Sequence, residues 1–156
     1  MARILIVGVG NTLMGDDGLG VHALELVRSK ELPSGVDTLE RGKSLIHALP
    51  DLTGYEKLIL LDAVVTDEDG VVVIRNPEFA GPLHQAISLH ELGIEEALRL
   101  LLLEMGYLPE VVIMGVRPER IAFGMELSAV TSARTQKLAD TVMEEICRDR
   151  LAYSKN

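Results

Sequence analysis

The stretch Gly8-Val-Gly-Asn-Thr-Leu-Met-Gly-Asp-Asp-Gly-Leu-Gly20 decides the fold, because it joins an apolar strand to an amphipathic helix. The residues before it, Ile4-Leu-Ile-Val7, form a continuous apolar run, which is typical of a strand covered on both faces of a parallel sheet. After Asp17 the apolar spacing becomes helical, and the apolar residues from Leu19 to Val27 fall on one stripe. The stretch therefore predicts the start of an α/β domain.

Two adjacent carboxylates, Asp16 and Asp17, stand at the start of this helix. A glycine-rich turn first suggests a dinucleotide fingerprint, with Glu40 near the end of the next strand as the ribose-binding acid. Leu13 takes the place of the third glycine, however, and two carboxylates at a helix N-terminus repel a phosphate and attract a cation. We therefore favour a cation site over a nucleotide site. The alternative that the aspartates only cap the helix stays open.

Length and composition fit one compact domain with an aliphatic core. The chain has 156 residues, is 47% hydrophobic, and contains two Phe, three Tyr and no Trp. A domain of this size buries enough surface to fold without a metal or a disulfide. We expect a single domain over residues 1–156.

The charge of the chain restricts its partners. A formal net charge of −9 argues against nucleic acid and against an anionic membrane, since neither would gain from charge attraction. The N-terminus has no cleavable signal pattern, and no apolar run has the length of a membrane span. The single Cys147 fits a reducing compartment. We expect a cytoplasmic protein whose partner is a protein or a cation.

Strand and helix patterns alternate along the rest of the chain. Apolar runs and turn residues predict strands at 36–40, 57–65, 71–74 and 111–116. They predict helices at 44–52, 89–105 and 128–151. The segment 120–127 is ambiguous, with one more strand as the alternative to a loop. Such alternation predicts a mainly parallel, twisted sheet with helices on both faces. The fold class is therefore α/β.

An aspartate and a histidine later in the chain stand out by position. Asp62 interrupts a fully apolar strand near its end, where an ionised carboxylate needs a cation or a place at the mouth of the sheet, unless it only caps a loop. His90 follows Ser88 in a predicted capping box, in a first turn where the helix dipole favours the neutral ring that metals bind. Taken alone, His90 fits an ordinary polar residue better than a metal ligand.

The predicted topology brings three of these side chains together. In open α/β sheets, ligands bind outside the carboxyl ends of the strands. Asp17 follows the first strand, Asp62 ends the third, and His90 opens a helix after the fourth. Two carboxylates and one imidazole make a site for a divalent transition ion, with positions left open for water or substrate.

Several motifs in order along the chain resemble those of the hydrogenase maturation proteases, the endopeptidases that trim the C-terminal tail of the large subunit of nickel-iron hydrogenases. The matching motifs are Gly8-x-Gly-Asn11-x-Leu13-x-x-Asp16-Asp17-Gly-x-Gly20, Leu61-Asp62-Ala63, Ser88-x-His90-x-Leu92-Gly93, Gly115-Val-x-Pro118-Glu119 and Leu127-Ser128. The first motif is specific for this family, and the other motifs are moderate evidence separately and strong evidence together.

The resemblance implies a single three-layer, phosphorylase/hydrolase-like α/β domain and a metal site formed by Asp17, Asp62 and His90. It implies that the metal is nickel carried by the substrate, the large-subunit precursor, although another divalent transition metal would suit the same site. Asp16 is the nearest candidate general base for a metal-polarised peptide bond, with the helix cap as its alternative. We expect a monomer.

The chain also departs from the family pattern. Where relatives usually have Asp-Gly-Gly-Thr it has Glu40-Arg41-Gly42-Lys43, Asp17 stands where many relatives have Glu, and Ala129 replaces a common Pro. The first departure changes the charge beside the cleft and leaves the substrate open. Two alternatives to a protease are therefore kept, a nickel-dependent binding or chaperone module that does not cleave and a nucleotide-binding regulator.

Overall fold

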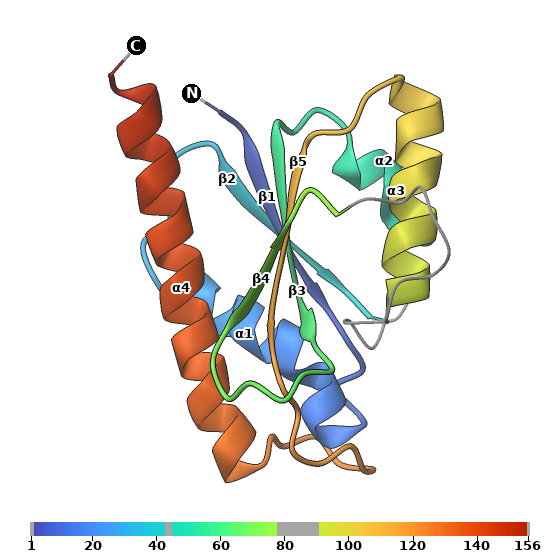
Figure 1. The fold of residues 1–156 in the computed structure, drawn as a ribbon, viewed down its shortest axis with the longest axis vertical. Helices are drawn as coiled ribbons and strands as arrows, with labels where there is room; N and C mark the ends of the chain where they lie inside the picture. Colours follow the sequence, from blue (N-terminus) through green and yellow to red (C-terminus); the bar gives the residue numbers. More distant parts are fainter. Residues whose placement is uncertain (1, 43–44, 78–90, 156) are drawn as a thin grey trace.

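The computed structural model describes residues 2–42, 45–77 and 91–155, which form a sheet between two layers of helices (Figure 1). The sheet has the strand order β2-β1-β3-β5-β4. Its strands are β1 (Ile4–Val9), β2 (Val36–Arg41), β3 (Lys57–Ala63), β4 (Val72–Arg75) and β5 (Glu110–Val116). All neighbours are parallel except β4, which runs antiparallel to β5 at the edge. The predicted α/β class with a mainly parallel sheet is confirmed.

The helices cover both faces of the sheet. They are η1 (Gly15–Gly18), α1 (Leu19–Arg28), η2 (Ile46–Ala48), α2 (Leu49–Leu52), α3 (Glu91–Met105) and α4 (Ala129–Tyr153). On one face α1 and α4 pack against Ile6, Ile59 and Met114. On the other, η2, α2 and α3 pack against Val7, Leu60 and Ile113. Successive strand residues therefore serve opposite cores, which explains why β1 is apolar throughout and β3 is apolar from Leu58 to Leu61.

Two predicted elements differ from the structure. Segment 120–127 is not a strand, since its backbone forms only an isolated bridge between Met14 and Gly124. The predicted helix at 44–52 is shorter and irregular, with η2 followed by α2. Pro50 lies in the first turn of α2, where its missing N–H is tolerated, and this position fixes where α2 begins.

No helix in the described ranges combines the length and the apolar character that crossing a bilayer requires.

Candidate functional site

The turn after β1 folds back tightly on itself and presents Asp17. Gly10 has a φ of +143°, and a Cβ there would lie 2.3 Å from the Asp17 carbonyl oxygen, so only glycine fits. The backbone N–H of Asn11 donates to Asp17 Oδ2 at 3.2 Å. Asp17 is 8% exposed. The glycines of the sequence motif therefore serve to bring this carboxylate to the end of β1.

Asp62 lies at the corresponding end of β3. It is fully buried, and its Oδ1 accepts a hydrogen bond of 2.8 Å from the Ala63 N–H. Its partner across the sheet is Gly115, where a Cβ would lie 2.2 Å from the Asp62 carbonyl oxygen. A carboxylate has lone pairs for several partners, so it can accept this hydrogen bond and also bind a cation.

Asp17 and Asp62 lie on segments that come together at the carboxyl ends of the parallel strands. β1 and β3 are parallel neighbours, and η1, which carries Asp17, packs against β3. A Cβ on Gly20 would lie 2.2 Å from the Leu61 carbonyl oxygen and 2.3 Å from that of Val9, so α1 begins directly on both strand ends. The sequence prediction that these two segments converge is thus realised in the fold.

The third predicted ligand, His90, lies outside the described residues. Within the ranges that the structure does describe, no three His, Cys, Asp or Glu side chains are grouped to hold a metal ion. Since the predicted set includes His90, the three-residue site stays a prediction. The two buried carboxylates supply oxygen donors that suit a divalent cation.

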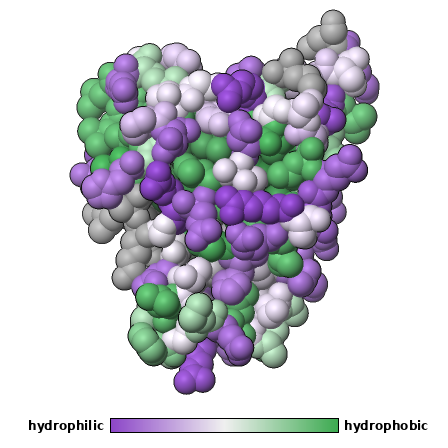
Figure 2. Space-filling model, turned by 180° about the vertical axis from the view of Figure 1, so that it is seen from behind, coloured by the Kyte–Doolittle hydropathy of each residue, from purple (hydrophilic) through white to green (hydrophobic). Residues whose placement is uncertain are grey.

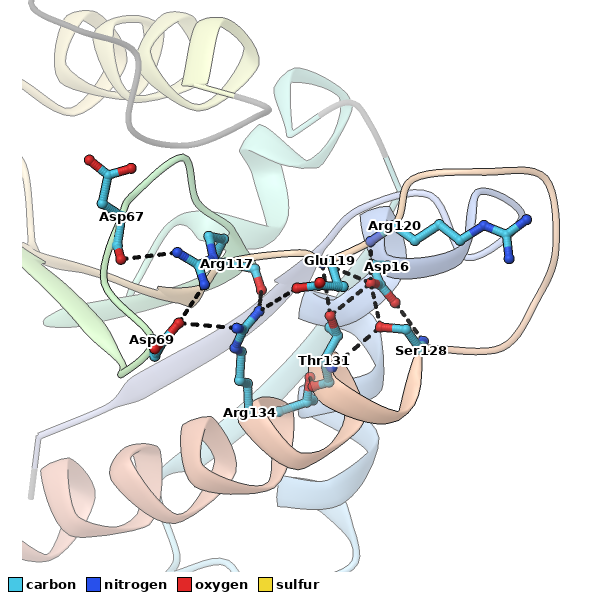
Figure 3. A network of polar contacts seen from close by, with 10 residues as sticks. Asp16, Asp67, Asp69, Arg117, Glu119, Arg120, Ser128, Thr131 and Arg134 are labelled. Carbon is cyan, nitrogen blue, oxygen red and sulfur yellow. Dashed lines mark hydrogen bonds and ion pairs between the residues drawn. The ribbon is translucent and has the colours of Figure 1, made fainter.

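Asp16 has a different set of partners from its neighbour (Figure 3). Its buried carboxylate accepts five hydrogen bonds of 2.7 to 2.9 Å, from the backbone N–H groups of Glu119, Arg120 and Ser128 and from the hydroxyls of Ser128 and Thr131. These donors come from the loop after β5 and from the start of α4. Asp16 therefore joins the first turn of the chain to segments more than a hundred residues away.

These contacts set the proton affinity of Asp16. Burial raises the pKa of this carboxyl, but the hydrogen bonds from the Arg120 and Ser128 backbone and from the Thr131 and Ser128 hydroxyls outweigh it, and the net pKa is lowered. A carboxylate with a lowered pKa and its oxygens engaged by donors is a weak base. The geometry favours a positioning role for Asp16 over the general-base role.

Neither Asp16 nor Asp17 occupies the N-cap position of α1, although both lie in the first turn of η1, which leads into α1. The residue that caps α1 is Gly18, which has no side chain to accept a hydrogen bond. Asp16 is turned to the distant loop, and Asp17 accepts from Asn11. The predicted cap at Ser128 is confirmed, because its Oγ accepts from the Thr131 N–H at the start of α4.

A second group of ion pairs continues from this loop (Figure 3). Arg134, on α4, donates to the Arg117 carbonyl at 3.0 Å and lies 3.4 Å from a Glu119 carboxylate oxygen. Asp69, from the loop before β4, pairs with both Arg117 and Arg134. The sequence analysis predicted Ser128 as the cap of the last helix, but no local pattern links Ser128 or Thr131 to Asp16.

The segment that departs from the family pattern lies beside the turn. Glu40 is exposed and lies 3.8 Å from Arg28, while Arg41 pairs with Asp51 at 2.9 Å. The Gly42 carbonyl accepts a hydrogen bond from the Gly10 N–H, so this segment is tied to the loop that carries Asp17. Lys43 lies outside the described residues.

Comparisons with known proteins show which sequences and folds the chain is similar to. The family model for HycI, hydrogenase maturation protease, matches residues 21–146. A hydrogenase 2 maturation protease of Escherichia coli (strain K12) is 28% identical over 145 residues, which cover 90% of this chain and 88% of that protein.

Solved structures share the whole fold. The hydrogenase maturating endopeptidase HybD from E. coli superposes with a TM-score of 0.81 at 27% identity, covering 94% of this chain and 93% of that one. The [NiFe] hydrogenase maturation protease HybD from Thermococcus kodakarensis gives a TM-score of 0.79 at 28% identity, covering 92% and 99%.

Proposed function

The chain belongs to the hydrogenase maturation proteases, and from this premise we propose that it removes the C-terminal extension of a [NiFe]-hydrogenase large-subunit precursor. Membership of this family makes it a peptidase that acts in hydrogenase maturation. The further steps of the proposal are that the precursor already carries nickel, and that Asp17, Asp62 and His90 recognise this nickel. The enzyme recognises its substrate by its metal content.

The observation that carries the proposal is the pair of buried carboxylates at neighbouring strand ends. Asp17 is 8% exposed and Asp62 is fully buried. Burying two carboxylates at neighbouring strand ends is costly, and a divalent cation offsets this cost. A precursor that brings nickel to this edge therefore binds better than one without it. Another divalent transition ion with the same ligand preferences would suit these residues too.

The chemistry is hydrolysis of one peptide bond. Water adds to the carbonyl carbon, the C–N bond breaks, and the leaving amine takes up a proton. A divalent ion held by Asp17, Asp62 and His90 would supply Lewis-acid chemistry, by polarising the carbonyl or acidifying the water. Asp17 and Asp62 bind the metal and thereby orient the substrate, while Asp16 holds the loop between β5 and α4 in place.

We also propose that the enzyme works as a monomer in the cytoplasm. The one cysteine, Cys147, is exposed and unpaired, which suits a reducing compartment.

The test is a cleavage assay on purified large-subunit precursor, prepared with and without nickel, with loss of the tail measured by mass spectrometry. We expect the wild-type enzyme to cut only the nickel-loaded precursor, and Asp17→Ala and Asp62→Ala to leave the tail in place. Asp140→Ala, at an exposed position on α4, is the control and should cleave normally. Equal cleavage of the nickel-free precursor would refute metal recognition. Nickel-dependent binding without cleavage would indicate a chaperone instead.

A further inference from the structure

The loop between β5 and α4 presents apolar side chains to solvent. Phe123, one of the two phenylalanines of the chain, is 88% exposed. Four more exposed apolar side chains belong to this loop, to the start of α4 and to the turn after β1. We call the whole set the apolar rim; it consists of Leu13, Ile121, Phe123, Met125 and Val130. Figure 2 shows apolar side chains at the lower end of the molecule, where Figure 1 places this loop.

The backbone of the loop is fixed to the turn after β1. The Gly124 N–H donates to the Leu13 carbonyl at 2.9 Å, and the Gly15 N–H donates to the Gly124 carbonyl at 2.7 Å. A Cβ on Gly15 would lie 3.0 Å from the Ala122 carbonyl oxygen, so the two backbones are in close contact. Because the backbone is held from inside, the exposure of the rim does not come from a loose chain.

The ends of the loop are held by Asp16. Its carboxylate accepts from the Arg120 and Ser128 N–H groups, which flank the rim residues 121–125 on both sides. The next residue in the chain is Asp17, which belongs to the proposed metal-recognition site. A polypeptide seated on the rim therefore lies directly beside that site.

Exposed apolar side chains grouped in this way mark a binding surface. Holding them in a fixed backbone lowers the entropy lost on binding. A peptidase must also hold a polypeptide next to its site, and the rim is continuous with the turn that carries Asp17. These observations favour the protein substrate over a second copy of this chain as the occupant.

We propose that the apolar rim is the docking surface for an apolar segment of the large-subunit precursor, next to the peptide bond that is cut. This inference rests on the proposed function and adds to it the surface that binds the protein part of the substrate. Nickel recognition and rim docking are then separate contributions to binding. Loss of the rim should raise KM and leave the chemical step intact.

The test compares the double variant F123S/M125S with the wild-type enzyme in steady-state cleavage of nickel-loaded precursor. We expect KM to rise about tenfold and kcat to stay within about twofold, as for loss of an interface anchor. Leu103→Ser is the matched control, since Leu103 is 80% exposed near the end of α3. Figure 1 places that end of α3 at the opposite end of the molecule. Thermal unfolding verifies that both variants are folded.

Other outcomes distinguish the alternatives. An unchanged KM in the double variant, or an equal rise in Leu103→Ser, overturns the inference. A wild-type dimer that the double variant dissociates, with KM unchanged, would assign the rim to a second copy and also overturns it. If the wild type binds precursor without cutting it and the double variant loses binding, the proposed function is refuted but the docking role of the apolar rim is supported. If the wild type does not bind precursor, both fail.

Discussion

At the scale of single residues, two neighbouring aspartates carry different tasks. Asp16 is surrounded by donors from within the chain, whereas Asp17 lies in η1, which packs against β3, the strand that carries Asp62. The side chains of adjacent residues in a tight turn point in different directions, so one can hold structure while the other meets substrate. This division predicts that the two residues respond differently to the same substitution.

Asp16→Asn should destabilise the fold by about 3 kcal/mol, because the amide replaces one acceptor oxygen by a donor and leaves a buried N–H without an acceptor. The measurement is the free energy of unfolding in urea. Cleavage at low temperature, where the variant is still folded, should keep much of the wild-type kcat. Asp140→Asn, an exposed substitution, should change the free energy by less than about 0.5 kcal/mol. Unchanged stability with complete loss of kcat would restore the general-base role.

At the scale of elements, the start of α1 depends on contact between backbones. Gly20 lies in the first turn of α1, against the carbonyl oxygens of Leu61 and Val9. In an exposed helix, a change from glycine to alanine stabilises by about 1 kcal/mol. Here a Cβ would lie 2.2 Å from one of those oxygens, so the helix must move off the sheet. The sign of the effect is therefore reversed.

Gly20→Ala should destabilise the protein by about 3 kcal/mol, comparable to overpacking a core, and should lower cleavage as Asp17 moves with the helix. Urea unfolding and the precursor assay measure the two effects. Gly70→Ala is the control, since a Cβ there meets no atom within 4 Å. Equal stability of the two variants would show that α1 does not rest on these carbonyls.

The sequence predicted the elements whose signals are local. The unbroken apolar runs of β1 and β3 and the Ser128 cap of α4 were all readable, because strand burial and helix capping depend on nearby residues. The path of segment 120–127 could not be predicted from the sequence, because it is set by hydrogen bonds to Asp16 and no local pattern links Asp16 to this segment. For the same reason the sequence located Asp16 at the site but did not find its partners.

At the scale of the whole molecule, the proposed site lies at the carboxyl ends of the parallel strands, and a buried ion network lies at their amino ends. At the amino end of β3, Lys57 Nζ lies 2.7 Å from Glu145 Oε1 and 2.8 Å from Asp149 Oδ2, both on α4. Arg75 binds the same Glu145 carboxylate through two nitrogens, at 2.6 and 2.7 Å. The ion network binds the C-terminal half of α4 to β3 and β4, while Asp16 binds the start of α4. The long helix is therefore held near both of its ends.

The network gives stability a defined dependence on pH. The hydrogen bond from Arg75, with a further one from Lys57, overcomes the effect of burial and lowers the pKa of Glu145 to about 2 from its ordinary 4.5. A carboxyl with a lowered folded-state pKa contributes stability above its unfolded pKa and loses it as pH falls toward the folded value. Glu145 should therefore contribute fully above pH 4.5 and progressively less down to about pH 2.

Glu145→Gln tests this dependence. At pH 7 the variant should be less stable by about 3 kcal/mol, since the buried Lys57 loses one of its two close carboxylate partners and Arg75 loses the carboxylate that it binds through two nitrogens. The difference between wild type and variant in urea unfolding should stay constant from pH 7 to about 4.5 and shrink between 4.5 and 2. Glu144→Gln, on the exposed side of α4, controls for the general effect of removing a carboxylate. A difference that stays constant down to pH 2 would show that Glu145 does not supply the charge that holds α4 to β3.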